Sequence, residues 1–256
     1  MIEQTLLKLR KETSFNRNIA HVEPLPERGA IYGEIKKELP DKITDYLEIN
    51  NIRLYKHQCD SLDAIREGNN IIITTPTASG KTLAFNLPIF EVMENDHKAT
   101  ALYLYPAKAL SNDQLKVLRK LELETEIRVN PNVYDGDTPS ALRPKIRNES
   151  RIIVSNPYEI HHILSWHYKW QHFFSNLKFV VLDEAHIYRG VFGSNVSLLI
   201  RRLQRICEYY GSKPQFIIST ATLANPIEFA EKLTGLKYKL ISEDGSPKGK
   251  KYFIFY

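Results

Sequence analysis

The chain has 256 residues, of which 43% are hydrophobic and 25% are charged, so its composition supports one large α/β domain with a real core, or such a domain with an appendage. Its net charge of +5 is mildly basic and is compatible with an anionic partner. The 2 cysteines, Cys59 and Cys207, stand alone without CxxC spacing, which argues against a disulfide framework and a structural zinc site. No apolar run approaches membrane-spanning length and no signal-peptide pattern is present, so we expect a soluble, cytoplasmic protein with no membrane partner.

The two ends of the chain differ from its middle. Residues 1–50 predict a helical and irregular extension, in which Pro24, Pro26 and Gly29 interrupt a weak amphipathic pattern. Residues 243–256 predict a polar, glycine-rich linker followed by a strand-like run, the first strand toward a further domain. The main domain is therefore expected over residues 51–242.

From residue 71 onward, segments typical of strands and of helices alternate. The expected strands are 71–73, 100–105, 128–134, 151–155, 177–182 and 215–219, and the expected helices begin at 83 and then cover 108–121, 139–148, 157–164, 194–210 and 226–233. This alternation predicts an α/β fold with a mostly parallel central sheet and helices on both faces. A ligand of such a sheet binds at the carboxyl ends of the strands.

The stretch Thr75–Thr82 (Thr-Pro-Thr-Ala-Ser-Gly-Lys-Thr) lies between an expected strand and an expected helix, as a phosphate-binding loop does. Its small residues let backbone N–H groups surround phosphate oxygens, and the start of the helix adds partial positive charge. Lys81 can reach the outer phosphates, and the Thr82 hydroxyl can ligate Mg²⁺. Thr75 departs from the Gly or Ala that usually opens the motif. The expected nucleotide-binding residues are Thr77, Ala78, Ser79, Gly80, Lys81 and Thr82, with Lys81 also catalytic.

The alternative interpretation of this stretch is a chance Gly-Lys-Thr at the start of a helix. The strand-like run before it and the helical pattern after it argue against that interpretation. Gln58 lies shortly before the loop, and its amide can use both faces on N6 and N7 of adenine. Alone, Gln58 would be an ordinary surface residue of a helix. Because it precedes a phosphate loop, we expect Tyr55 and Gln58 to contribute to the nucleotide site.

Asp183 and Glu184 directly follow the apolar strand expected at 177–182, where a parallel sheet binds its ligand. A carboxylate there can hold Mg²⁺, directly or through water, while the ion bridges phosphate oxygens. A neighbouring carboxylate can position and deprotonate the attacking water. We assign the first role to Asp183 and the second to Glu184. Two solvated acids after a buried strand are the alternative interpretation.

Taken in order, four stretches resemble the motifs of the first RecA-like domain of superfamily two helicases of the DEAH-box type. These stretches are Gln58, Thr75–Thr82, Asp183–His186 and Thr220–Thr222. Within that superfamily, the chain looks most like the RecQ-related branch that contains the mitomycin-repair, DUF1998-associated helicases. The narrower resemblance is carried by Leu54–Gln58, Tyr134–Pro139, Tyr188–Ser194 and Ser219–Pro226, and it covers nearly the whole chain from about residue 20.

The resemblance implies a RecA-like three-layer sandwich that binds ATP and Mg²⁺ and is stimulated by nucleic acid. It also implies a second RecA-like domain that supplies arginine fingers, so we expect a fragment that is monomeric and weak or inactive alone. The implied partner is a single strand, with DNA favoured over RNA, in a repair-related helicase that moves 3′ to 5′. An RNA helicase, a duplex translocase and a non-catalytic nucleic-acid-binding module remain as alternatives.

Three junctions between a strand and a helix are expected to contact the nucleic-acid backbone. Alone they are typical of ordinary helix caps, and the resemblance is what makes them parts of a strand path with little sequence preference. The expected contact residues are Pro106, Lys108, Ser111 and Gln114 at the first junction, Gly136, Asp137 and Thr138 at the second, and Asn156 and Pro157 at the third.

The stretch Tyr188–Ser194 follows the two acids and is typical of a glycine-bounded loop, in which Arg189 and Phe192 could stack on bases. The alternative is a turn with Phe192 buried. By resemblance, His186, Thr220 and Thr222 couple the nucleotide state to the strand.

The histidine-rich stretch His161–His172 suggests a metal site, but it lacks nearby cysteines and has few acids. We therefore expect a helical connection, which packs Trp166, Trp170, Phe173 and Phe174.

Overall fold

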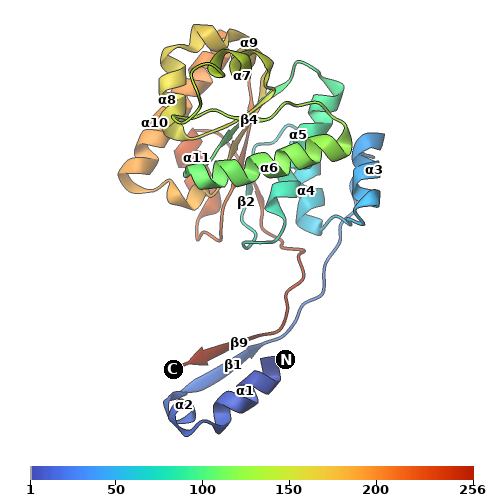
Figure 1. Ribbon diagram of the computed structural model, residues 1–256, viewed down its shortest axis with the longest axis vertical. Helices are drawn as coiled ribbons and strands as arrows, with labels where there is room; N and C mark the ends of the chain where they lie inside the picture. The colour runs from blue at the N-terminus through green and yellow to red at the C-terminus, as the bar shows by residue number, and fades with distance from the viewer. Residues whose placement is uncertain (1) are drawn as a thin grey trace. The chain divides into compact units, whose positions relative to one another are not determined.

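The computed structural model describes residues 2–256 and divides the chain into two compact units (Figure 1). The larger unit spans Tyr32–Gly245, and the smaller unit combines the N-terminal residues through Ile31 with Ser246–Tyr256. This division differs from the expected one, because residues 32–50 group with the main sheet and the end of the chain groups with its beginning. Among residues 2–256, no helix has both the length and the apolar character needed to cross a membrane.

The larger unit is built on a seven-stranded sheet in the order β4-β5-β3-β6-β7-β2-β8, and its strand pairs are parallel. The strands are β2 (Ile71–Ile73), β3 (Thr100–Leu104), β4 (Asn132–Val133), β5 (Ile152–Ser155), β6 (Leu177–Leu182), β7 (Gln215–Ser219) and β8 (Lys239–Ile241). The central strands are apolar runs without polar alternation, because helices cover both faces of the sheet. The expected α/β fold with a parallel central sheet is confirmed.

Alternate residues along a strand face two separate hydrophobic cores. On β3, Ala101 and Tyr103 belong to one core, whereas Leu102 and Leu104 belong to the other. The first core includes residues of α3 (Asp41–Ile49), α4 (Lys56–Arg66), α5 (Lys81–Asn95) and α6 (Lys108–Thr125). The second includes residues of α8 (Pro157–Ser165), α9 (Gln171–Ser175), α10 (Gly190–Tyr209) and α11 (Pro226–Thr234). The short elements α7 (Arg143–Glu149), η1 (His167–Trp170) and η2 (Ala185–Ile187) pack against this second core through Ile146, Trp170 and Ala185.

Several segments differ from the sequence expectations. The strand expected at 128–134 is reduced to the two residues of β4 at one edge of the sheet, and β8 at the other edge was not expected. An edge strand has one neighbour and one open side, so it carries a weaker apolar signal. In the histidine-rich stretch, Trp170, Phe173 and Phe174 are buried as expected, but Trp166 is 55% exposed, so its expected packing is wrong.

The smaller unit pairs the two ends of the chain. It contains α1 (Ile2–Lys11), α2 (Thr13–Asn18) and the strands β1 (His21–Leu25) and β9 (Lys251–Phe255). The strands are antiparallel, with His21 opposite Phe255. The strand-like run at the end of the chain therefore pairs with a segment that the sequence predicted to be irregular, since Pro24 lies inside β1.

We predict that backbone amides exchange with solvent much faster in the smaller unit than in the larger one. A two-stranded sheet is marginally stable by itself, and no side chain of α1 or α2 is buried. By contrast, β3 is buried along its whole length, so its amides should exchange only through global unfolding. Hydrogen exchange read by mass spectrometry checks this, and equal protection of β1 and β3 would contradict it.

Candidate active site at the carboxyl edge of the sheet

The phosphate loop connects the end of β2 to the start of α5. Ala78 and Gly80 adopt left-handed backbone angles, with φ of 62° and 86°, which turn the chain sharply before the helix begins at Lys81. The hydroxyl oxygens of Thr75 and Ser79 lie 2.7 Å apart in a hydrogen bond that closes the loop across its base. Thr75 is fully buried, so the departure at the first motif position supplies an internal brace.

The side chain of Lys81 folds back over its own loop. Its Nζ donates hydrogen bonds of 2.8 Å to the carbonyl oxygens of Thr75 and of Pro76. Burial lowers the pKa of the Lys81 ammonium, and the carboxylates of Glu184 and Asp183 oppose that shift. The Lys81 ammonium is thus bonded to two neutral carbonyl oxygens. Phosphate oxygens that replaced them would form stronger, charge-assisted hydrogen bonds with the ammonium.

Gln58 lies on α4 and forms a hydrogen bond with the phosphate loop. Its Oε1 accepts a hydrogen bond from the Tyr55 backbone N–H at 2.9 Å, and its Nε2 donates to the Gly80 carbonyl at 3.0 Å. The side chain is 4% exposed, and both ends of its amide are used inside the protein. Each end of this amide keeps one further hydrogen-bonding position, so the expected contact with N6 and N7 of adenine stays a prediction.

An aromatic stack lies at the start of α4. The Tyr55 ring stacks on Tyr32 and on His57, with ring centroids 5.7 Å and 5.9 Å away. The Arg53 guanidinium lies 4.2 Å from the centroid of the Tyr32 ring. Burial lowers the pKa of His57, whose Nδ1 accepts a hydrogen bond from the Gly245 N–H. The sequence expectation included Tyr55 but missed Tyr32, which lies in a segment without a recognisable motif.

Asp183 and Glu184 lie where β6 ends, at the same edge as the phosphate loop. The Asp183 carboxylate accepts a hydrogen bond of 2.9 Å from the Glu184 N–H, and burial raises the pKa of Asp183 above its usual value. Glu184 has a φ of 49°, a strained angle for a residue with a side chain, of the kind that clusters at functional sites. Its Oε2 lies 3.2 Å from His186 Nδ1.

Three hydroxyl groups are buried at this edge: those of Tyr105 and Ser219 lie close to the Asp183 carboxylate, and that of Thr220 has no hydrogen-bond partner within residues 2–256. Tyr105 directly follows β3, Ser219 is the last residue of β7, and Thr220 directly follows β7. These two strands lie on either side of β6. Buried polar atoms without partners are rare in native proteins and point to a missing water, ion or ligand. The edge is therefore built to receive a polar group.

The residues at this edge fit Mg²⁺ bound together with a nucleotide. The Thr82 hydroxyl and the Asp183 carboxylate are hard oxygen donors of the kind that Mg²⁺ prefers. Within the described part of the chain, no group of three or more His, Cys, Asp or Glu side chains could hold a metal ion by itself. Mg²⁺ typically binds through one or two protein ligands plus substrate phosphates, which agrees with this donor set.

The first two expected nucleic-acid junctions contact each other through an ion pair. Lys108 Nζ forms a 2.7 Å ion pair with the Asp137 carboxylate, and Lys108, Gly136 and Asp137 are exposed. Ser111 and Gln114, however, are 1% and 6% exposed, so their side chains are not available to a strand in this arrangement.

Asn156 caps α8, its Oδ1 accepting a hydrogen bond from the Glu159 N–H at 3.0 Å. Arg143, which was not among the expected site residues, also organises the second junction. Its guanidinium donates to the carbonyl oxygens of Asp135 and Thr138, and it forms an ion pair of 2.9 Å with Glu159. A lone arginine inside the helix expected at 139–148 gives no sequence signal for such a role.

The stretch Tyr188–Ser194 is not a loop, because α10 begins at Gly190. A Cβ atom on Gly193 would lie 2.4 Å from the Tyr188 carbonyl oxygen, so only glycine lets the chain approach itself this closely. Arg189 is exposed and Phe192 is 43% exposed, with its ring 5.6 Å from that of Tyr188. Of the expected coupling residues, Thr220 is buried beside the acids and Thr222 is exposed.

The DEAD/DEAH box helicase family model matches residues 55–229, which include the phosphate loop and the two acids. The chain belongs to the DEAD/DEAH box helicase family. It is 42% identical over 258 residues to the uncharacterized ATP-dependent helicase YprA of Bacillus subtilis, covering 100% of this chain and 34% of YprA. It is 39% identical over 262 residues to the ATP-dependent helicase HRQ1 of Saccharomyces cerevisiae, covering 99% of this chain and 24% of HRQ1.

A solved structure of the DUF1998 helicase MrfA bound to DNA and AMPPNP matches with a TM-score of 0.94 at 41% identity. The match covers 99% of this helicase chain and 35% of MrfA. The resemblance to DUF1998-associated helicases and the RecA-like fold are thereby confirmed. The chain spans about a third or less of the length of these relatives.

We predict that Gly80→Ala lowers stability more than Gly68→Ala and also weakens nucleotide binding. Both glycines have left-handed backbone angles, with φ of 86° at Gly80 and 82° at Gly68. An alanine at either position therefore destabilises the fold by about 1–2 kcal/mol through backbone strain. A Cβ atom at position 80 would also lie 2.6 Å from Gln58 Nε2, whereas nothing lies within 4 Å of one at position 68. Chemical denaturation and titration with a fluorescent ATP analogue measure the two effects, and equal effects of both substitutions would contradict the role of the Gln58 contact.

Proposed function

We propose that this chain is the ATP-binding motor domain of a nucleic-acid-stimulated helicase that hydrolyses ATP with Mg²⁺ to move along a single strand. The observation that carries the proposal is the convergence of Lys81, Asp183 and Glu184 at one edge of the sheet, close enough for both carboxylates to influence the pKa of the lysine. A triphosphate held by the loop at this edge would meet a cation, a metal-binding carboxylate and a candidate base together.

Each of these residues has a distinct task in the proposed reaction. The loop N–H groups and the start of α5 bind the phosphates, and Lys81 exchanges its carbonyl partners for phosphate oxygens. Thr82 and Asp183 would hold Mg²⁺, which when bound neutralises charge between the phosphate groups. Glu184, whose Oε2 lies 3.2 Å from His186 Nδ1, orients the attacking water and accepts its proton.

The proposed path for the strand runs over the exposed residues at the junctions after β3, β4 and β5. The ion pair between Lys108 and Asp137 would open as a phosphate replaces the carboxylate, because an exposed pair of this kind is weak. Such contacts position a strand without reading its sequence. DNA is favoured because the structure of the 41% identical MrfA contains DNA.

Full activity is proposed to require a second RecA-like domain. The proposal is supported by the length of the relatives, since this chain covers only 34% of YprA, 24% of HRQ1 and 35% of MrfA. Arginines contributed by another domain would stabilise the charge that develops on the phosphates. The isolated chain is therefore expected to bind nucleotide and to turn it over slowly.

We predict that Glu184→Gln lowers single-strand-stimulated ATP turnover by about 100-fold or more, because a positioned base contributes that much to proton transfer. Glu126→Gln is the matched control, since Glu126 is an exposed glutamate with the same left-handed backbone, at φ of 55° against 49° for Glu184. Turnover is measured by phosphate release with and without oligo-dT.

Nucleotide binding by both variants should stay within about twofold of wild type, since neither glutamate binds phosphate oxygens. Unchanged turnover in Glu184→Gln would exclude Glu184 as the base. Loss of turnover in Glu126→Gln as well would mean that the effect is not specific to the site.

A further inference from the structure

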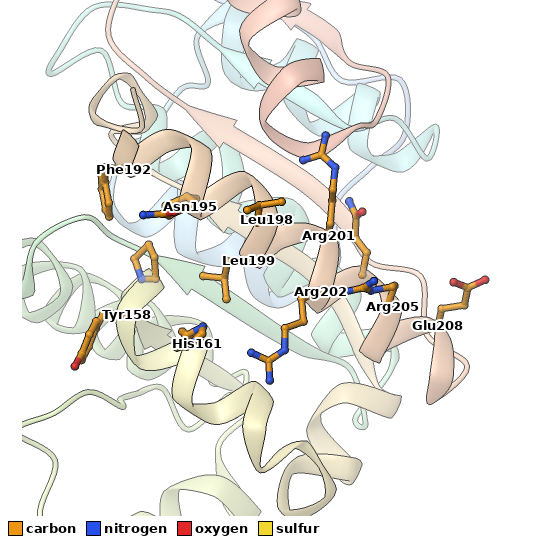
Figure 2. A pocket seen from close by; sticks show the side chains of 13 residues that line it. Tyr158, His161, Phe192, Asn195, Leu198, Leu199, Arg201, Arg202, Arg205 and Glu208 are labelled. Carbon is orange, nitrogen blue, oxygen red and sulfur yellow. The ribbon is translucent and has the colours of Figure 1, made fainter. Parts of the chain in front are cut away.

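A groove of about 940 Å³ lies between α8 and α10, outside the nucleotide site (Figure 2). Tyr158 and His161 of α8 face Phe192 and Leu199 of α10 across it, and Arg202 and Arg205 lie further along α10 (Figure 2). From Phe192 to Glu208 this part of α10 is about 24 Å long at 1.5 Å per residue. We call this surface the α8–α10 groove.

At one end of the groove, aromatic rings and apolar side chains are exposed to solvent. Tyr158 is 74% exposed and Phe192 is 43% exposed, and Leu198 between the ends is 66% exposed. The Tyr158 ring contacts the His162 ring in a T-shaped arrangement, with centroids 4.9 Å apart, and most of its surface remains exposed to solvent. Exposed aromatic faces are the surfaces on which bases of a single strand stack.

The other end of the groove carries positive charge that the described residues do not neutralise. Arg205 has no partner within residues 2–256, and Arg202 donates only to the Ser165 hydroxyl, at 3.2 Å. Neither pairs with a carboxylate in this part of the chain, although Glu208 also borders the groove. Guanidinium groups free of carboxylates suit phosphate oxygens, which they bind in a planar, bidentate manner.

The groove is continuous with the proposed strand path. Pro157, at the start of α8, lines the groove, and it directly follows Asn156 at the third junction. Phe192, which was expected to stack on a base, lines the same end. Pro157 and Phe192 lie 35 positions apart in the chain, and both were predicted to contact nucleic acid. Both line the same groove.

We propose that the α8–α10 groove binds a further segment of the single strand, with Tyr158 and Phe192 stacking on bases and with Arg202 and Arg205 contacting phosphates. This inference rests on the proposed function, because it extends the strand beyond the junction at Asn156. An acidic protein segment would also complement the arginines. The two rings at the end that adjoins the strand path favour nucleic acid.

The test compares short and long strands on the 256-residue chain. Fluorescence anisotropy is measured with labelled oligo-dT of about 6 nucleotides, which the three junctions can hold, and of about 20 nucleotides, which can also enter the groove. The variants are Tyr158→Ala and the double substitution Arg202→Ala with Arg205→Ala. Arg119→Ala with Lys120→Ala is the charge-matched control, because these exposed residues lie on α6, against the other core.

The double variant should bind the long strand about tenfold more weakly, and its salt dependence should fall by about 1.4 in slope, the value for two phosphates on a single strand. Tyr158→Ala should weaken binding of the long strand by about fivefold or more, because one base would lose the ring on which it stacks. Both variants should bind the short strand within about twofold of wild type, as should the α6 control with either strand. Arg202→Lys with Arg205→Lys keeps the charge and should recover most of the loss.

Equal binding of the long strand by wild type and both groove variants would overturn the groove proposal and leave the proposed function intact. That result would point to a protein segment as the occupant. A wild-type chain that binds neither strand would instead contradict the nucleic-acid part of the proposed function itself. Thermal melting of each variant distinguishes a lost contact from a lost fold.

Discussion

Parallel pairing of the seven main strands places all of their carboxyl ends at one edge of the sheet. The phosphate loop after β2, the acids after β6 and the hydroxyls at the ends of β3 and β7 are far apart in sequence, and this one constraint brings them together. Helices that cover both faces of the sheet close the two cores and leave that edge as the exposed place where loop and helix starts converge. The position of the candidate nucleotide site is thus a consequence of strand direction.

Within that edge, the loop is held in a ready conformation by contacts inside the protein. The hydrogen bond between Thr75 and Ser79 braces its base, Gln58 holds Gly80, and Lys81 rests on two carbonyl oxygens. The buried Thr220 hydroxyl nearby lacks a hydrogen-bond partner among residues 2–256, which points to a polar group that binds at this edge. We infer that ligand binding exchanges internal contacts for contacts with phosphate and leaves the sheet unchanged.

The parts of the fold and site that could be predicted from sequence are those with a local signal. The run Ile71–Ile73 before Gly80-Lys81-Thr82, and the apolar strand before Asp183 and Glu184, each carry their structure within about ten residues. The pairing of β1 with β9 has no such signal, because its partners lie at opposite ends of the chain and Pro24 lies inside one of them. The contacts of Arg143 and Tyr32, the burial of Ser111 and the engaged amide of Gln58 likewise depend on tertiary packing that no short stretch encodes.

The most direct test of this account is a crystal structure of the chain with AMPPNP and Mg²⁺. We expect Lys81 Nζ to leave the carbonyl oxygens of Thr75 and Pro76 and to contact phosphate oxygens, with Mg²⁺ between Thr82 and Asp183 and with the sheet unchanged. A triphosphate bound elsewhere on the chain, or bound at the loop with Lys81 still on its two carbonyls, would contradict the central claim that this edge is a preorganised nucleotide site.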